Sequence, residues 1–107
     1  VFDNIFFSPI YVKTLCSHIF KVLKKKPYGI FNLGSSDCIS KADFAFYIAK
    51  KMRFKKKLLT KSKYNPKTFR ARRPKYMCMN SNKFKKFFKI KLNTSYHEID
   101  KMIGSET

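Results

Sequence analysis

Few residues in this chain are of the types that do catalysis or bind metals. It has two histidines, six acidic residues and three cysteines. His18 lies between the apolar positions of a helical pattern and is best interpreted as a packing residue, while His97 lies in the first turn of a later helix, away from any nucleophile. Cys16, Cys38 and Cys78 form no C-x-x-C pair, which argues against a structural zinc site and against a disulfide framework. We therefore expect no catalytic residue, and three free, buried or half-buried thiols in a reducing compartment.

The Arg72-Arg73-Pro74 cluster is a better candidate for binding than for catalysis. A guanidinium group makes bidentate hydrogen bonds to phosphate oxygens, so arginines in a loop between α/β elements suit the phosphates of a ligand. The same residues also fit an ordinary exposed basic loop. The residue types alone leave both interpretations open.

The net charge of +19 would attract a polyanion such as a nucleic acid. Only four of the 25 basic residues are arginines, however, and lysine, phenylalanine, isoleucine and asparagine are abundant together, as AT-rich codon usage would produce. The aromatic residues mostly occupy core-facing helical positions rather than sites for stacking bases. We interpret the lysine runs as solvated surface and expect no specific nucleic acid. No apolar run reaches the roughly 18 residues that a membrane span needs, so we expect no membrane either.

The first half of the chain predicts the order helix, strand, helix. Apolar residues at helical spacing predict a helix from Val12 to about Lys25 with one buried face, formed by Val12, Leu15, Cys16, Ile19, Phe20 and Leu23. The run 29–34, GIFNLG, predicts one buried strand. Ser40 followed by Asp43 resembles a capping box for a second helix that continues to Met52.

The second half predicts two more helices and little regular structure between. LLT at 58–60 could be a short strand, and Asn65-Pro66 indicates a loop. NSNKFKKFF predicts a short helix that begins at Asn80 or Ser81. Ser95 and Glu98 predict a capping box for a last helix, before a frayed tail at 104–107. At 107 residues these elements make one α/β domain, mostly helical with a few short strands.

Three blocks of this sequence, in order, resemble the C-terminal third of the dTDP-4-dehydrorhamnose reductase family. SPIYVKTL is similar to the family's P-T-Y-x-x-D-L-A stretch, and GIFNLGSSDCISKADFAFYIAKKM to its G-I-Y-H-x-x-G block with the S/T-x-x-[DE]-[FY]-A that follows. RARRPKYMCMNSNKFKKFFKIKL is similar to its R-P-x-x-x-x-L-[DN]-x-x-K-[FL] block. Ile10 replaces the usual Thr, Thr14 the usual Asp, and Met79 the usual Leu. The resemblance covers nearly the whole chain.

This resemblance implies the substrate-binding lobe, residues 1–103, of an extended short-chain dehydrogenase/reductase with a Rossmann-type NAD(P)-binding domain. It implies reduction of a 4-keto sugar on a nucleoside diphosphate, with NADPH or NADH held by an N-terminal domain that this chain lacks. It places Ser8, Pro9 and Tyr11 beside the substrate, and we choose Arg73, with Arg72, for the diphosphate.

The family's Gly-rich dinucleotide fingerprint and its Tyr-x-x-x-Lys catalytic pair are expected in that absent domain. Tyr47 and Lys51 have the spacing of the pair, but they lie in the block that resembles a substrate-domain helix, so we interpret the spacing as coincidental. The chain also begins on Val1 without a leader, which suggests a fragment.

We therefore expect this lobe to be inactive alone, and its parent to be a cytoplasmic enzyme, assembled as a homodimer, in polysaccharide biosynthesis. The alternatives are a fragment of a nucleotide-sugar epimerase or dehydratase, and a small basic nucleic-acid-binding domain.

Overall fold

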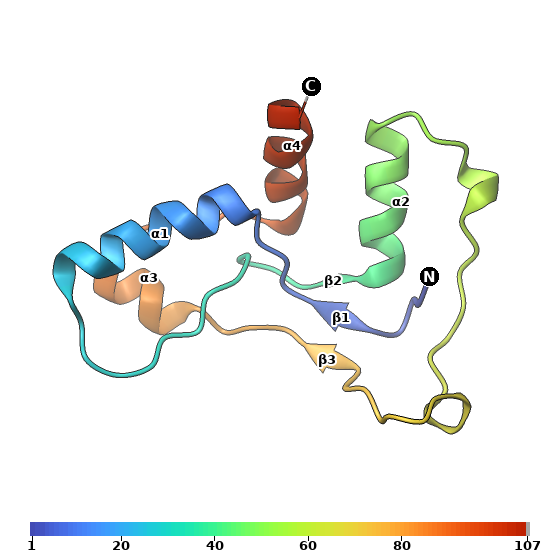
Figure 1. The fold of residues 1–107 in the computed structure, drawn as a ribbon, viewed down its shortest axis with the longest axis horizontal. Helices are drawn as coiled ribbons and strands as arrows, with labels where there is room; N and C mark the ends of the chain where they lie inside the picture. The colour runs from blue at the N-terminus through green and yellow to red at the C-terminus, as the bar shows by residue number, and fades with distance from the viewer. Residues whose placement is uncertain (107) are drawn as a thin grey trace.

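The computed structural model describes residues 1–106 as four α-helices around a very small β-sheet (Figure 1). The elements are β1 (Phe6–Phe7), α1 (Val12–Lys25), β2 (Ile39–Ser40), α2 (Lys41–Lys51), the 3-10 helices η1 (Lys56–Leu58) and η2 (Pro66–Thr68), β3 (Tyr76–Met77), α3 (Asn82–Phe88) and α4 (Ser95–Glu106). This is the mostly helical α/β fold that the sequence predicted. No helix among residues 1–106 combines the length and the apolar character that crossing a bilayer requires.

The three strands pair in the order β2-β1-β3. β1 is antiparallel to β2, and it is parallel to β3, with Phe6 opposite Tyr76 and Phe7 opposite Met77. The rings of Phe6 and Tyr76 stack across the parallel pair, with centroids 5.5 Å apart. Because β1 and β3 are parallel, the residues that follow β1 lie beside the residues that follow β3.

The predicted strand at 29–34 is wrong in this structure, where those residues form no strand. No backbone–backbone hydrogen bond involves residues 28–33 within the described part of the chain. The segment has a strand-forming composition, but a strand forms only where another strand pairs with it. The possible strand at 58–60 is also wrong, because η1 occupies its start.

Helix boundaries agree closely with the sequence pattern, but the exposure of α1 and the end of α4 differ from it. α1 spans the predicted residues, yet the apolar face expected to be buried is largely exposed, and its buried residues are Thr14 and His18. α2 begins as expected, with the Ser40 hydroxyl accepting a hydrogen bond from the Asp43 amide at 3.0 Å. The last helix continues to Glu106, so the expected tail at 104–107 is helical up to that residue, and Thr107 lies outside the described residues.

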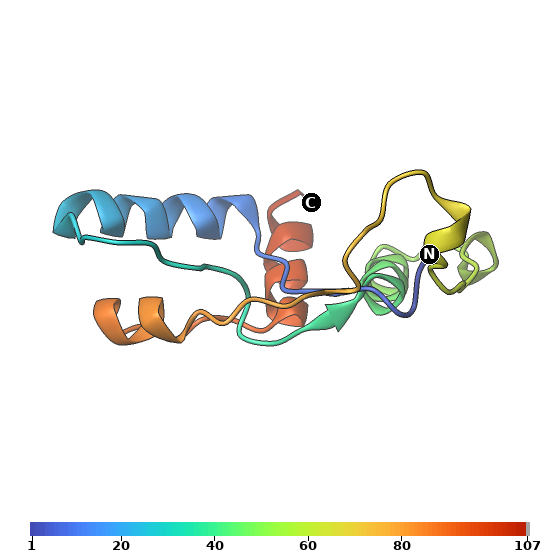
Figure 2. The ribbon, with the colours of Figure 1, turned by 90° about the horizontal axis from the view of Figure 1, so that it is seen from below.

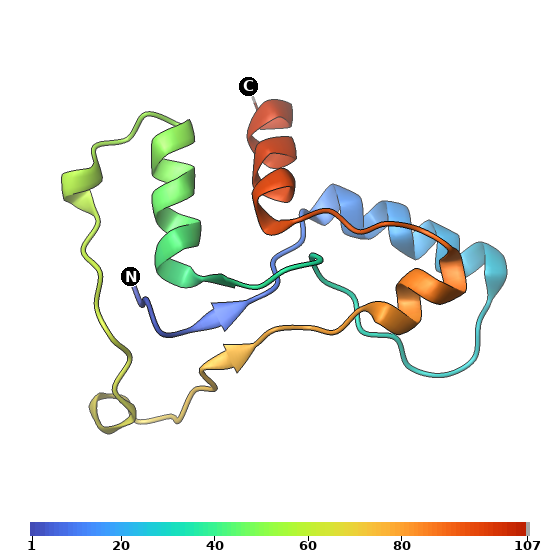
Figure 3. The same ribbon diagram turned by 180° about the vertical axis from the view of Figure 1, so that it is seen from behind.

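The helices divide into two groups along the long axis of the molecule. α2 lies beside α4, while α1 and α3 lie on the other side of α4 (Figures 1 and 3). The buried apolar residues are Ile5, Ile39, Ala42, Ala49, Tyr64, Phe84, Phe88 and Ile99. The radius of gyration is 16.0 Å, whereas a compact domain of this length has about 13 Å. The lobe is therefore open and extended rather than closed around one core.

Candidate functional site

Ser8 lies between the end of β1 and the start of α1, and its hydroxyl links two other segments. The Ser8 hydroxyl donates to the carbonyl oxygen of Asp37 at 2.9 Å and accepts from the Met79 amide at 3.0 Å. The side chain is almost fully buried. Its one proton is therefore committed inside the lobe, so the structure gives Ser8 the role of positioning the segment that follows it.

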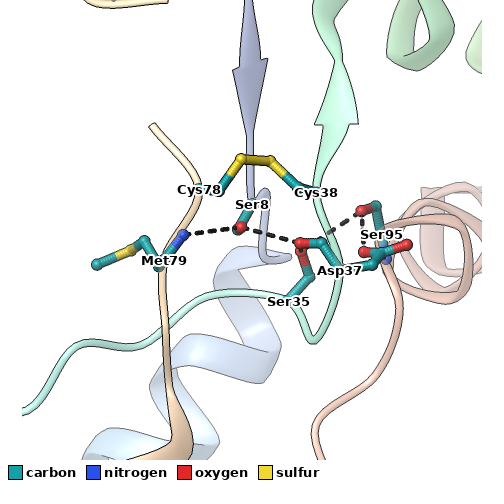
Figure 4. The surroundings of a disulfide bond; sticks show 7 residues. All are labelled: Ser8, Ser35, Asp37, Cys38, Cys78, Met79 and Ser95. Carbon is teal, nitrogen blue, oxygen red and sulfur yellow. Dashed lines mark hydrogen bonds between the residues drawn. A yellow bond between two sulfur atoms is a disulfide. The ribbon is translucent and has the colours of Figure 1, made fainter. Parts of the chain in front are cut away.

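A disulfide joins the same two segments beside Ser8 (Figure 4). Cys38 and Cys78, adjacent to Asp37 and Met79, are bonded to each other, with Cα atoms 5.5 Å apart. This corrects the expectation of three free thiols: Cys16 is free, but it is exposed rather than buried. The two bonded cysteines are 40 residues apart, and only the sheet brings them together.

Asp37 also holds the start of α4. Its carboxylate accepts hydrogen bonds from the amide of Ser95, at 2.7 Å, and from the Ser95 hydroxyl (Figure 4). The capping box predicted from Ser95 and Glu98 is therefore wrong. Thr94 supplies the cap instead, since its hydroxyl accepts from the His97 amide at 3.2 Å. Ser8, the disulfide and Asp37 together fix the positions of β1, the 78–79 segment and α4.

Pro9 and Tyr11 line a cavity of about 60 Å³ where α2, α4 and the start of α1 meet. Its other lining residues are Ile10, Phe44, Ser95, Glu98, Ile99 and Met102. Sites for small molecules usually measure about 300–1,000 Å³, so this cavity is far too small for a sugar nucleotide. It can at most receive one protruding group of a ligand.

A buried carboxylate lies in the wall of this cavity. Glu98 is only 3% exposed, and its carboxylate accepts from the Thr14 hydroxyl at 3.0 Å. Lys101 donates to the same hydroxyl at 3.1 Å. A buried carboxylate needs such donors, because its charge loses the hydration it has in water.

His18 lies one turn along α1 from Thr14 and packs edge-on against Phe84, with ring centroids 5.4 Å apart. Its Nδ1 is buried and has no hydrogen-bond partner. Burial lowers the pKa of His18, the positive charges of Lys21 and Lys101 lower it further, and Glu98 opposes them. His18 is therefore a packing residue, as the sequence pattern predicted.

The structure separates Arg72 and Arg73 from the Ser8–Tyr11 segment. Both arginines are exposed, in the loop that precedes β3, and the Arg73 amide donates to the Tyr64 hydroxyl at 2.8 Å. Because β1 and β3 are parallel, residues before β3 lie at the opposite end of the sheet from residues after β1. In the strand register, Arg73 lies five residues before the level of Ser8, which in extended chain is roughly 17 Å. One ligand would therefore need to be long to contact both the arginines and the Ser8–Tyr11 segment.

Tyr47 and Lys51 do not have the environment of a catalytic pair. The Tyr47 hydroxyl donates to the carboxylate of Asp100 at 2.8 Å, and the Lys51 ammonium lies 3.7 Å from the same carboxylate. Burial and the hydrogen bond to Asp100 raise the pKa of Tyr47, whereas a tyrosine that acts as an acid or base near neutral pH needs a lowered pKa. This contact joins α2 to α4.

Sequence reasoning missed Asp37 and the cysteine pair as organising residues. Asp37 lies in a polar turn, where an aspartate is expected for the turn alone and indicates no further role. Asp37 directly precedes Cys38, and a second cysteine lies at position 78; this is the signal that the sequence offered for the site. Among residues 1–104, whose side chains the structure describes, no group of three or more histidine, cysteine or acidic side chains could hold a metal ion.

Comparison with known proteins yields one family and two solved structures. The family described as the RmlD substrate binding domain matches residues 1–107. The crystal structure of dTDP-4-dehydrorhamnose reductase from Bacillus anthracis in complex with NADP superposes with a TM-score of 0.83 and 22% identity, covering 100% of this chain. That of dTDP-4-dehydrorhamnose reductase from Yersinia enterocolitica has a TM-score of 0.77 and 22% identity, covering 96%. A search of curated proteins finds no significant match.

The chain spans only 37% and 36% of the two reductase chains. The likeness therefore concerns the fold of one part of those proteins. The matches confirm the predicted fold, a mostly helical α/β lobe like the substrate-binding part of these reductases.

Proposed function

This chain belongs to the RmlD substrate binding domain family, and we propose that it is the substrate-side portion of an NAD(P)H-dependent nucleotide-sugar reductase. The parent reaction would reduce a 4-keto sugar carried on a nucleoside diphosphate. The family match over residues 1–107 is the observation that carries the proposal. The likeness to two dTDP-4-dehydrorhamnose reductases supports it.

In this proposal the nicotinamide cofactor, NADPH or NADH, belongs to a domain outside the lobe. The Bacillus anthracis protein carries NADP in its crystal structure, which supports this class of cofactor. The proton donor also belongs to that domain, because the Tyr47 and Lys51 side chains are both occupied by Asp100. The lobe alone would then turn over no substrate.

Two surfaces of the lobe are proposed to contact the sugar nucleotide. Pro9 and Tyr11 line the cavity beside Glu98, where a ligand group of a few atoms fits, and Ser8 holds their segment in place. Arg72 and Arg73 offer guanidinium groups for the diphosphate. A cleft of ligand size would form only when the rest of the enzyme closes over this surface, since the cavity itself measures about 60 Å³.

Titration of the isotope-labelled chain with dTDP, followed by NMR, tests the diphosphate contact. Saturable shifts in the arginine side-chain signals are expected, weakened in Arg73→Ala and kept in Arg70→Ala, a matched control from the same exposed loop. If both variants lose the dTDP-induced shifts equally, or if inorganic phosphate reproduces the shifts, the binding is non-specific electrostatic attraction. Absence of any dTDP binding to the parent protein would refute the proposed function itself.

The nucleic-acid alternative makes a different prediction in the same type of experiment. Binding to duplex or single-stranded DNA that persists near physiological salt would favour it, since purely electrostatic binding falls steeply with salt. An epimerase or dehydratase parent would bind the same ligands, and product analysis would distinguish it from a reductase.

The cytoplasm remains the compartment we propose for the parent enzyme, and a homodimer its proposed assembly. The argument from free thiols no longer supports the compartment, because Cys38 and Cys78 are bonded. Thiol counting in freshly lysed cells would test it, with three thiols per chain expected in a reducing compartment.

A further inference from the structure

The chain between α2 and η2 combines dense positive charge with exposed apolar side chains. Residues 53–63, RFKKKLLTKSK, include six basic residues and no acidic residue. All six basic residues are exposed. We call this stretch the 53–63 basic segment, and its charge alone would attract an anionic partner.

Two exposed apolar side chains lie within this charge. Phe54 is 56% exposed and Leu58 is 73% exposed. Both line an apolar groove of about 380 Å³, whose opposite wall is α2, and Lys55 lies at the same groove. Apolar residues interspersed with lysines are typical of segments that lie in the surface of an anionic membrane. In such segments the apolar groups enter the acyl boundary while the lysines stay at the headgroups.

The 53–63 basic segment lies at one end of the long axis of the molecule. It follows α2 and runs along the outer side of that helix, whereas α1 and α3 extend to the other end (Figures 1 and 2). The molecule measures 46 Å along this axis. Interactions between exposed charges are screened over about 10 Å at 0.1 M salt. The lysines at the two ends therefore act on a bound surface independently.

The described residues place two carboxylates beside the segment. The Lys63 ammonium lies 3.4 Å from the carboxylate of Asp3, and Asp43 lines a hollow together with Lys56. Six positive charges against these two negative charges leave a clear positive excess. An anionic surface is therefore complementary to this part of the molecule.

Other lysine-rich parts of the chain differ from this segment in their apolar residues. α3 carries lysines, but its Phe84 and Phe88 are buried. α1 presents a longer apolar face, of the kind that a surface helix packs against protein, so we do not assign it to a membrane. The 53–63 basic segment is too short and too charged to pack in that way.

We propose that the 53–63 basic segment is a peripheral docking surface for an anionic lipid bilayer. Phe54 and Leu58 would enter the boundary between headgroups and acyl chains, and the lysines would pair with lipid phosphates. The segment would lie on the bilayer without crossing it, which is compatible with the lack of a membrane-spanning helix among residues 1–106. This revises the sequence-based expectation of no membrane partner, which considered spanning alone.

A nucleic acid is the other polyanion that this charge could attract. Proteins that bind nucleic acids without sequence preference use aromatic rings that stack on bases, and arginine forks suit their phosphates. The segment has one aromatic ring and one arginine. Leu58, its most exposed apolar residue, has no ring to stack. An aliphatic side chain among lysines fits the acyl boundary of a bilayer better.

An introduced tryptophan tests insertion, because the chain contains none of its own. Leu58→Trp is mixed with vesicles of phosphatidylcholine and phosphatidylglycerol at near-physiological salt. A blue shift of its emission and quenching by brominated lipid are expected. Ile30→Trp, at an 84% exposed position in the segment after α1, is the matched control and should show neither. Equal responses at the two positions, or the same response with phosphatidylcholine alone, would overturn the proposal.

The two lysine runs at 24–26 and 55–57 test the charge, because each consists of three lysines. Replacing the run at 55–57 by glutamine should weaken binding to the anionic vesicles on the order of a hundredfold, at about fivefold per lysine. The same replacement at 24–26, at the far end of α1, should have little effect. Unchanged melting temperatures would show that both variants fold. Equal weakening by the two replacements would mean that net charge alone binds, and the proposal would be wrong.

Leu58→Ser separates a bilayer from a nucleic acid. It should weaken vesicle binding on the order of tenfold and leave the melting temperature unchanged, since the side chain is largely exposed. Binding to duplex DNA without binding to the vesicles, at the same salt, would assign the segment to nucleic acid and refute the proposal. None of these experiments involves a sugar nucleotide. Vesicle binding without dTDP binding would therefore refute the proposed function and leave the docking surface standing.

Discussion

Replacing both Cys38 and Cys78 with serine is expected to destabilise the lobe strongly. The bond closes a loop between residues 40 positions apart, and that loop contains α2, both 3-10 helices and β3. The chain-entropy relation gives about 4 kcal/mol for a loop of this length, and measured losses are typically about 2–4 kcal/mol. Each strand has only two residues, so backbone pairing contributes little to replace the bond.

Thermal unfolding followed by circular dichroism measures this loss. At about 4 °C per kcal/mol, the double variant should melt roughly 8–16 °C below the oxidised wild type. Wild type treated with a phosphine reductant should approach the melting temperature of the variant. The Ser8 hydroxyl still links the same two segments, so the variant is expected to fold.

Cys16→Ser is the matched control, because Cys16 is exposed and closes no loop. Thiol titration should find one reactive thiol per oxidised chain and three after reduction, as one free and two bonded cysteines require. If the double variant lowers the melting temperature no more than Cys16→Ser does, the loop argument fails. If the untreated protein shows three thiols, the pairing itself is absent in solution.

Three further predictions concern single side chains. Ser8→Ala should lower the free energy of unfolding in urea by about 1–3 kcal/mol, because two backbone groups lose a buried partner; Ser36→Ala, at an exposed position, should change little. Glu98→Ala should cost about 1.5–3 kcal/mol, the range for hydrogen bonds to a charged group, and an unchanged urea midpoint would contradict the contact seen here. The lowered pKa of His18 means that the unfolded chain binds a proton at this residue more readily than the folded chain. The free energy of unfolding should therefore fall as the pH drops below about 6.5 towards the folded-state pKa, and His18→Gln should flatten this part of the pH profile.

Helix positions could be predicted from the sequence, but the surroundings of the helices could not. The spacing that predicts α1 from Val12 to Lys25 depends on the chain alone, and those bounds are confirmed. The same spacing identifies an apolar face without saying what covers it, so the expectation that the face is buried was wrong. The strand predicted at 29–34 failed for the same reason, because a strand needs a neighbour and the described chain supplies none.

Long-range pairs escaped prediction because their partners are distant in the sequence. The contact between Cys38 and Cys78 depends on the pairing of β1 with both other strands. The cap of α4 was assigned one residue too late, because Thr94 and Ser95 both have suitable hydroxyls. Asp37, 58 residues away, takes the hydroxyl of Ser95, which leaves Thr94 to cap the helix.

The departure at position 14 becomes understandable from the same kind of contact. The family pattern has an acid where this chain has Thr14, and the structure places Thr14 against the buried carboxylate of Glu98. An aspartate there would bring two carboxylates together in a site with little water, which disfavours ionisation of both. A hydroxyl instead donates to Glu98 and accepts from Lys101, so all three groups are satisfied between α1 and α4. The substitution therefore fits this chain's own contact between α1 and α4.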